Sequence, residues 1–325
     1  MKKEAKGKDY TEFICYIQEH TADFIYSHTG DEVTIQVLPV LKNNETVVQA
    51  MRILGKGRTA GPQIYVDDLF REYCLRSDMD QIMDCILNLY KAGYIYEKVL
   101  DPGDLHDFSR IRDKLVIRLI SGDKNRNLLK TCPHRDFLDM AITYRILAGK
   151  NEGGISTALV TNTLMDLWGI TEEEIYGIAM ENSVRIFPPR LKDMDTIIKE
   201  LEAFVPEGED QAITSDRLFW RNMLILSNDC GINGASAICY PHVLQACARR
   251  LESDFFILPS SIHEVILLAA SEVILPQELI KTVACANENV VSQEEILSDC
   301  VYYFHEKTGK IKKYTGQTHD KVLLS

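Results

Sequence analysis

The sequence lacks the short motifs that would assign it an activity. No two of its nine cysteines have the C-x-x-C spacing of a zinc or redox site, and no G-x-S-x-G marks a nucleophile elbow. In the glycine-bearing stretch 55–61 the lysine is followed by glycine, so the pattern of a phosphate-binding loop fails. We therefore expect no metal and no cofactor.

The chain also lacks an excess of positive charge and any long apolar run. Its 325 residues carry 48 acidic and 36 basic side chains, a formal net charge of -12, so its field repels phosphate backbones and anionic lipids. No apolar run approaches the roughly 20 residues that cross a bilayer. We expect neither nucleic acid nor a membrane as partner. The odd cysteine count and the lack of a secretory leader favour a cytoplasmic location.

Apolar periodicity indicates an α+β protein in which antiparallel hairpins are each followed by a helix. Asn43 and Asn44 form the turn of the first hairpin, and Asp67 opens the helix after it. The predicted hairpins pair 33–42 with 47–54, 140–147 with 155–161, and 223–227 with 235–240. Further helices are expected over 10–27, over 78–96 and around 279–283, with buried strands over 115–120 and 301–304, the last in the chain.

Local signals mark the ends of several elements. Thr171 with Glu174 and Ser292 with Glu295 have the spacing of capping boxes, and Pro241 occupies a first-turn position. The lysines at the two chain ends read as solvated tails; they are Lys2, Lys3, Lys6, Lys8, Lys307, Lys310, Lys312 and Lys313.

A turn cluster from Asp101 to Asp104 suggests how the chain divides. It separates a predicted amino-terminal α+β domain, 8–100, from a carboxyl-terminal α+β domain, 105–318. The boundary is soft, and a single large unit also fits the length.

The run 257–267 places polar side chains in a strongly strand-forming segment, where unpaired polar groups are costly to bury. In an extended strand His263 and Glu264 point to opposite faces, so we expect each to act as an internal tie. The zinc-protease pattern H-E-x-x-H fails because Leu267 stands at the second histidine position.

Ser261 and His263 share one face of that predicted strand. With Asp139 or His134 from the segment 133–139, they would complete the arrangement of a hydrolase that uses a serine nucleophile. The alternative is that the serines pair with backbone at a strand start and that His134 caps a chain end. No catalytic assignment follows from the sequence, and the candidate residues are Ser261, His263, Glu264, His134 and Asp139.

Several segments, in order along nearly the whole chain, resemble a domain-of-unknown-function family of uncharacterised bacterial proteins common in gut clostridia. The residues that carry the resemblance are 41–44, 62–67, 133–139, Ala141, Ile142, Leu167, Trp168, Ala179, Glu181, Asn182, 233–235, 257–267, Asn287, Glu294, Glu295, 297–299, Val301 and Tyr302. The resemblance implies a bacterial cytoplasmic protein of about this length and implies no activity. The stretch 55–61 departs from the family in being more basic.

These observations favour a non-enzymatic binding or adaptor scaffold that holds an unidentified protein partner or a second copy of itself. The fold class alone does not allow a reaction to be assigned to the protein. The rival hypothesis is the hydrolase that uses Ser261 and His263. Self-association through exposed aromatic residues near the carboxyl end is a further expectation.

Overall fold

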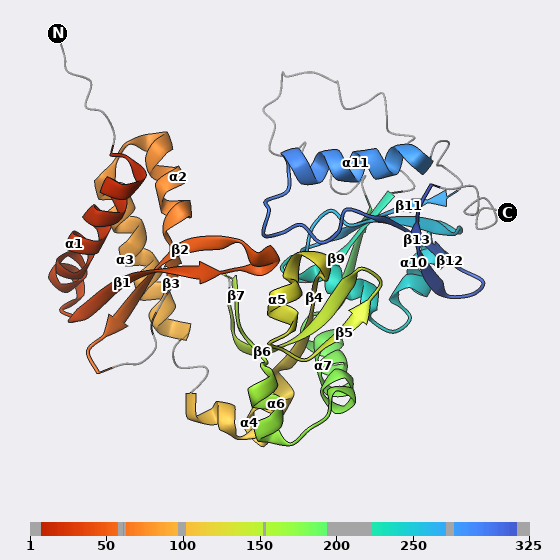
Figure 1. Cartoon of the computed structure of the whole chain (residues 1–325), viewed down its shortest axis with the longest axis horizontal. Helices are drawn as coiled ribbons and strands as arrows, with labels where there is room; N and C mark the ends of the chain where they lie inside the picture. The colour runs from red at the N-terminus through yellow and green to blue at the C-terminus, as the bar shows by residue number, and fades with distance from the viewer. Residues whose placement is uncertain are drawn as a thin grey trace, which may run out of the picture. The chain divides into compact units, whose positions relative to one another are not determined.

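The chain folds into two compact units, and each is described by itself. Unit one comprises Met1–Leu105 with Ala148–Ser156, and unit two comprises His106–Leu147 with Thr157–Ser325. Asp101, residues 58–60 and the terminal Lys2, Lys3 and Lys6 lie outside the described residues. The computed structural model describes residues 8–57, 61, 63–96, 102–151, 154–193, 223–270 and 276–316 (Figure 1).

Unit one is an antiparallel sheet in the order β1-β2-β3, packed against helices α1, α2 and α3. In the turn between β1 and β2, Asn44 takes a φ of 60°, a left-handed conformation that asparagine tolerates better than most residues. The first predicted hairpin and the helices on either side of it are confirmed. The elements are α1 (Tyr10–Thr29), β1 (Val33–Leu41), β2 (Val47–Gly55), β3 (Gln63–Tyr65), α2 (Val66–Arg76) and α3 (Met79–Tyr96).

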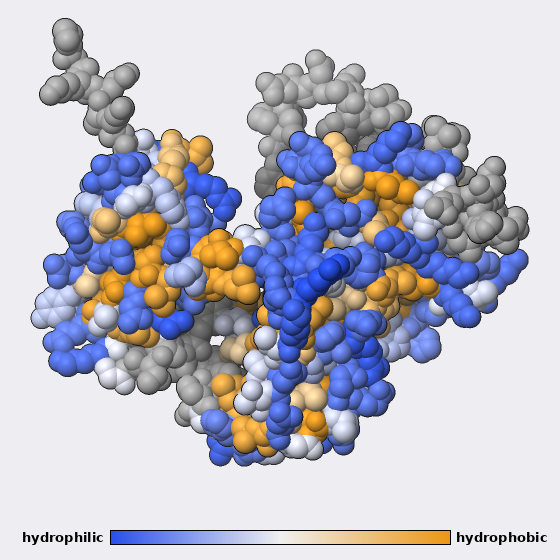
Figure 2. All heavy atoms as spheres, viewed as in Figure 1, coloured by the Kyte–Doolittle hydropathy of each residue, from blue (hydrophilic) through white to orange (hydrophobic). Residues whose placement is uncertain are grey.

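Apolar stripes on the helices and one face of the sheet build the core of unit one. Phe13 and Ile17 of α1, Met51 of β2 and Ile86 of α3 are fully buried. Burial alternates along most of β1, as expected for a sheet with one covered face. Beside the hairpin turn, Leu41 lies opposite Val47 and both stay exposed, in a region where Figure 2 shows apolar residues at the surface.

Unit two contains two antiparallel sheets. One has the order β4-β6-β5 with β7 also paired to β6, and the other has the order β13-β12-β10-β11-β9-β8. The end of β6 from residue 148, the start of β7 up to residue 156, and residues 102–105 of η2 are assigned to unit one. Antiparallel sheets with interspersed helices confirm the predicted α+β class. The elements are η2 (Pro102–His106), α4 (Phe108–Ile111), η3 (Arg112–Lys114), β4 (Leu115–Ser121), η4 (Asp123–Asn125), α5 (Arg126–Leu129), β5 (His134–Phe137), β6 (Met140–Asn151), β7 (Gly154–Leu159), α6 (Asn162–Trp168), α7 (Glu172–Ile186), β8 (Pro189–Asp193), β9 (Met223–Asn228), η5 (Gly234–Cys239), α10 (Val243–Leu251), β10 (Phe255–Leu258), β11 (Val265–Ala269), α11 (Pro276–Asn289), β12 (Val301–His305) and β13 (Lys310–Tyr314).

Strand β4 is an edge strand whose outward N–H groups are occupied by serines. Ile117 N–H donates to Ser183 Oγ of α7 at 2.8 Å, and Leu119 N–H donates to Ser236 Oγ of η5 at 3.0 Å. Ser183 also donates to its own helix at Ala179 O. These bonds attach α7 and η5 to the sheet and remove the open edge that would otherwise invite pairing with another chain.

The predicted hairpin of 223–227 with 235–240 is wrong. Its first half is strand β9, but both edges of β9 are already occupied, by β8 and by β11. The second half is the buried 3₁₀ helix η5, which packs against β9. The neighbouring hairpin of 140–147 with 155–161 is confirmed as β6 and β7.

The run 257–267 is two strands rather than one. β10 ends at Leu258 and β11 begins at Val265, and the two pair antiparallel with Leu258 opposite Ile266. The polar residues occupy the connecting loop 259–264, where Ser261 N–H donates to Glu264 O at 3.2 Å. Pro259 follows β10 directly and cannot extend the ladder, because it has no N–H.

The carboxyl end also differs from prediction. A further strand, β13, follows β12, so Lys310, Lys312 and Lys313 belong to a sheet and not to a tail. The aromatic side chains of Tyr302, Tyr303, Phe304 and Tyr314, near the carboxyl end, are buried.

Two predicted helix starts are also wrong. Ser292 and Glu295 lie in a turn, with Glu295 N–H donating to Ser292 O at 2.8 Å, instead of opening a helix. Pro241 precedes the N-cap residue His242 of α10 instead of occupying the first turn. The capping box of Thr171 and Glu174 is confirmed at the start of α7.

Candidate functional site

His263 lies in the loop between β10 and β11 and joins three segments of unit two. Asn233 N–H donates to its Nδ1 at 3.1 Å, and its Nε2 lies 3.2 Å from Glu295 Oε1. Because Nδ1 accepts a hydrogen bond, we assign the ring proton to Nε2, from which it is donated to Glu295. The main-chain N–H of His263 donates to Ser261 Oγ at 3.0 Å. His263 thus fastens the loop to the two neighbouring turns.

This geometry does not arrange Ser261, His263 and Glu264 as the sequence predicted. Both nitrogens of the imidazole are engaged, and Ser261 Oγ bonds the main chain of His263 rather than its ring. Activation of a serine nucleophile requires the ring bond. Because the segment is a loop, the prediction that His263 and Glu264 face opposite sides of a strand is wrong. Glu264 contributes its carbonyl oxygen, and within the described ranges its carboxylate has no hydrogen-bond or ion-pair partner.

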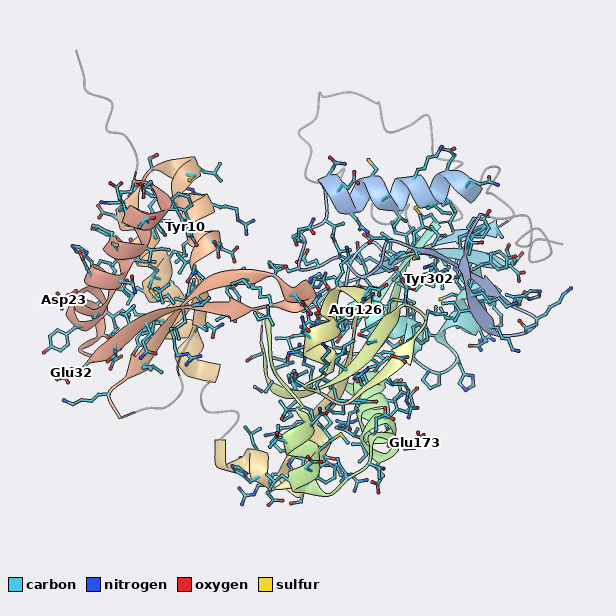
Figure 3. All side chains as sticks on the ribbon, in the orientation of Figure 1. Tyr10, Asp23, Glu32, Arg126, Glu173 and Tyr302 are labelled. Atoms are coloured by element: carbon cyan, nitrogen blue, oxygen red, sulfur yellow. The ribbon has the colours of Figure 1, made fainter. Side chains whose placement is uncertain are left out.

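Asp139 lies in a second polar cluster, at the turn between β5 and β6. Its carboxylate accepts hydrogen bonds from Tyr302 OH at 2.7 Å and from Ser298 Oγ at 2.8 Å. Tyr302 is labelled in Figure 3. Burial alone would raise the pKa of Asp139, but the bonds from Tyr302 and Ser298 outweigh it and hold that pKa below its usual value. Asp139 therefore stays ionised and ties the β5–β6 turn to β12.

His134 occupies a third position, on β5, where its Nδ1 lies 3.0 Å from Cys132 O and its backbone pairs with Thr143. The five candidate residues therefore fall into three places. Among the described contacts, none connects His263 with Asp139 or with His134. The structure shows no assembled triad.

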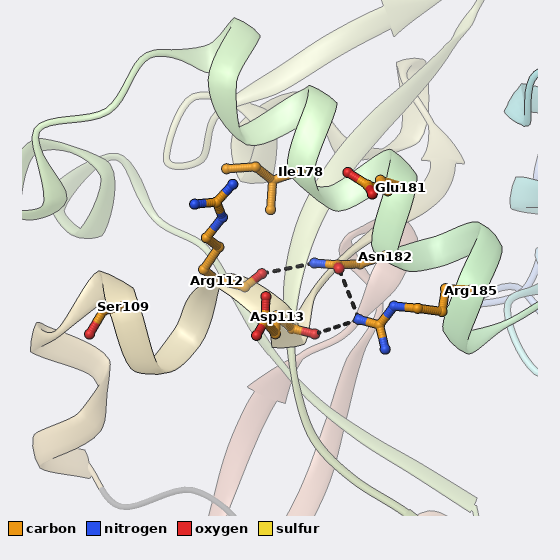
Figure 4. A pocket seen from close by; sticks show the side chains of 7 residues that line it. All are labelled: Ser109, Arg112, Asp113, Ile178, Glu181, Asn182 and Arg185. Atoms are coloured by element: carbon orange, nitrogen blue, oxygen red, sulfur yellow. Dashed lines mark hydrogen bonds between the residues drawn. The ribbon is translucent and has the colours of Figure 1, made fainter.

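A different surface of unit two is open. Two adjacent depressions, of about 550 Å³ and about 510 Å³, lie between helix α7 and the segment 108–113, and they share Arg112, Ile178 and Glu181. Figure 4 shows the side chains that line the first of them. We call this surface the α7 groove. Its lining residues are Phe108, Ser109, Arg112, Asp113, Ile170, Glu173, Glu174, Gly177, Ile178, Glu181, Asn182 and Arg185.

Several hydrogen bonds hold the two walls of the groove in place. Asn182 Nδ2 donates to Arg112 O at 2.8 Å, and its Oδ1 accepts from Arg185 Nη2 at 3.0 Å (Figure 4). The same Arg185 nitrogen lies 3.4 Å from Asp113 O. At the start of α7, Arg135 bonds both Glu172 and Glu173. Burial alone would raise the pKa of Glu172, but the bonds from Arg135 and Tyr144 outweigh it and lower that pKa. The groove is a preformed feature.

Some of the charged side chains that line the groove already have a hydrogen-bond or ion-pair partner (committed groups), and others have none in the described part of the chain (uncommitted groups). Glu173 pairs with Arg135, Glu174 closes the cap with Thr171, and Arg185 bonds Asn182. Arg112, Asp113 and Glu181 are exposed, and in the part of the chain that the structure describes their charged groups form no ion pair and no hydrogen bond. One cation and two anions therefore remain available to a ligand.

Gly177 lies in the middle of α7 and forms part of the groove floor. A Cβ built at this position has nothing within 4 Å. Glycine inside a helix costs about 0.5–1 kcal/mol relative to alanine, and neither its backbone conformation nor a close neighbour requires it here. Gly177 is exposed, and the packing of this chain does not require a glycine at this position.

Other sites are few in the described ranges. Those residues hold no group of three or more His, Cys, Asp or Glu side chains able to bind a metal. They also include no helix that is both long enough and apolar enough to span a bilayer. All nine cysteines are unpaired, and burial raises the pKa of Cys247 to about 11, so this thiol stays protonated.

The α7 groove was missed from the sequence. Glu174, Ile178, Glu181 and Arg185 recur at helical spacing, a pattern that equally describes a solvated helix face. The signal that distinguishes it is Gly177, an unneeded helix glycine within that stripe. The opposite wall, 108–113, is far away in sequence and carries no motif.

Comparison with known proteins gives one match. A family model described as a family of unknown function (DUF5688) matches residues 10–306. No curated protein and no solved structure matches this chain. The match spans elements of both units, and it confirms the resemblance to a family of unknown function noted from the sequence.

Proposed function

The chain belongs to the DUF5688 family, and we propose that it is a non-enzymatic binding protein that holds a protein partner in the α7 groove. Its nine unpaired thiols fit a further proposal, that it acts in the reducing cytoplasm. The single observation that carries the proposal is the free space over Gly177 between uncommitted charges on preformed walls.

The hydrogen bonding of His263 and Asp139, the other polar side chains considered as site residues, supports this proposal. His263 and Asp139 are engaged in hydrogen bonds that connect segments distant in sequence, which is the behaviour of structural groups. The groove differs, because its free groups face solvent. An open depression with charges of both signs suits a protein surface better than a small molecule, since small-molecule sites are mostly enclosed and apolar.

Filling the groove tests the proposal. Gly177→Leu places a bulky side chain over the floor and, because the space is open, leaves the fold intact; Gly177→Ala is the matched control. We expect both variants to raise the free energy of unfolding, the alanine by about 0.5–1 kcal/mol, in urea titrations. A subunit that co-purifies from the native host should remain with the alanine variant and be lost from the leucine variant, as measured by native mass spectrometry.

Hydrogen exchange supplies the second measurement. In the complex, backbone amides of 108–113 and of α7 should exchange more slowly than in the free chain. The proposal fails if Gly177→Leu retains the subunit at the wild-type ratio, or if protection appears only elsewhere in the chain.

A further inference from the structure

We infer that the partner segment in the α7 groove is an amphoteric peptide, with a carboxylate that faces Arg112, a basic side chain that faces Glu181 and an apolar side chain between them. This inference rests on the proposed function and adds the chemistry of the partner. It follows from the three residues that both depressions share, which are a cation, an apolar residue and an anion.

The first step concerns Arg112 and Glu181, which line the same space without pairing. Each is exposed, and in the described part of the chain neither lies within 4.0 Å of an opposite charge. Arg185 is held by Asn182, so it does not neutralise Glu181. A bound segment with one charge of each sign would satisfy both groups, and the guanidinium of Arg112 suits a carboxylate in bidentate geometry.

The second step concerns the space between the two charges. Ile178 is shared by both depressions, and Gly177 adjoins it with nothing above its backbone. Phe108 and Ile170 line the same depression, and the ring of Phe108 is supported by Trp168 at a centroid distance of 5.5 Å. These groups offer an apolar contact, so an apolar side chain of the partner would be buried here.

The third step excludes ligands of a single charge sign. Among the lining charges without a partner in the described part of the chain, the carboxylates of Asp113 and Glu181 outnumber the single guanidinium of Arg112, so a phosphate or an acidic segment would be repelled. A purely basic segment would place a like charge beside Arg112, which lines both depressions. Charge complementarity therefore selects a segment that carries both signs.

Short synthetic peptides on an array provide the test. Each peptide has a glycine-serine background with one Glu, one Leu and one Lys in every order and at several spacings. Control sets replace Lys by Glu, Glu by Lys, or Leu by Ser. We expect at least one arrangement of the amphoteric set to bind the full chain about fivefold or more tightly than every control, by fluorescence anisotropy of the released peptide.

Charge reversal locates that binding. Arg112→Glu and Glu181→Lys should each reduce the affinity about fivefold, whereas the matched reversals Arg250→Glu and Glu288→Lys, at exposed positions outside the groove, should leave it unchanged. Gly177→Leu should abolish it. Equal binding of a single-sign set, or reversals without effect, overturns the inference. If no peptide binds but Gly177→Leu still displaces the native subunit, the inference fails and the proposed function stands; if that subunit is also retained, both fail.

Discussion

Replacing Asp139 by alanine should lower the free energy of unfolding by about 3 kcal/mol. Tyr302 is fully buried, and its hydroxyl donates to Asp139 at 2.7 Å, as does Ser298 at 2.8 Å. The substitution removes a charged acceptor from both hydroxyls and leaves the Tyr302 hydroxyl with Ser298 alone. Urea unfolding measures the loss, and Asp136→Ala, at an exposed position on the same hairpin, is the control with an expected change within about 0.5 kcal/mol.

The same variant has a defined pH dependence. The pKa of Asp139 is lowered in the folded state, because the bonds from Tyr302 and Ser298 outweigh the effect of burial. Its stabilisation is therefore fully present above the unfolded-state pKa of about 3.9 and is lost as pH falls through the lower folded-state pKa. The difference between wild type and Asp139→Ala should be constant from neutral pH down to about pH 5 and should shrink below about pH 4. A difference that stays constant through the acid range would contradict the assignment.

Replacing Gly234 by alanine should lower the free energy of unfolding by about 2–3 kcal/mol. The added Cβ would lie 2.6 Å from Asn228 N and 2.6 Å from His263 O, both main-chain atoms, and 2.2 Å from Ser227 Oγ. Ser227 Oγ already donates to His263 O at 2.8 Å, so these neighbours cannot separate without breaking a bond. The destabilisation should therefore extend to the loop that carries His263.

Gly177→Ala is the matched control, because it adds the same methyl group to the same unit where nothing lies within 4 Å. The two variants should change stability in opposite directions, as read from urea midpoints. Gly234→Ala with wild-type stability would mean that the packing around η5 is looser than described.

The sequence predicted those elements whose signals are local. The first hairpin has its turn residues at Asn43 and Asn44, and α7 has its capping box at Thr171 and Glu174. Amphipathic periodicity located α1 and α3 within two residues at each end. Each of these features depends on residues a few positions apart, so no tertiary contact was needed to infer them.

The errors arose where distant contacts decide the structure. Ser292 and Glu295 show the same spacing as the capping box at Thr171, but Glu295 faces His263 and the segment forms a turn. Strong strand propensity on both sides of Pro259 concealed the loop between β10 and β11. Propensity describes the flanks of such a segment and says little about where a chain reverses.

The candidate site could not be predicted for a related reason. Sequence reasoning selected polar residues in apolar surroundings, and the structure places two of them, His263 and Asp139, in structural hydrogen-bond networks. The α7 groove requires two segments about 70 residues apart, as the Asn182 to Arg112 bond shows. Exposed charges on a helix are common, so only the opposing wall and the space over Gly177 distinguish this face.

We propose that His263 stabilises the fold and does not act on a substrate. Its most direct test is His263→Asn, compared with wild type in urea unfolding and in turnover of ester, peptide and phosphoester substrates. Because Asn233 and Glu295 lose a partner, we expect the variant to lose about 1–3 kcal/mol and wild type to show no turnover above the variant. A variant that keeps wild-type stability and loses a turnover that wild type possesses would contradict the claim.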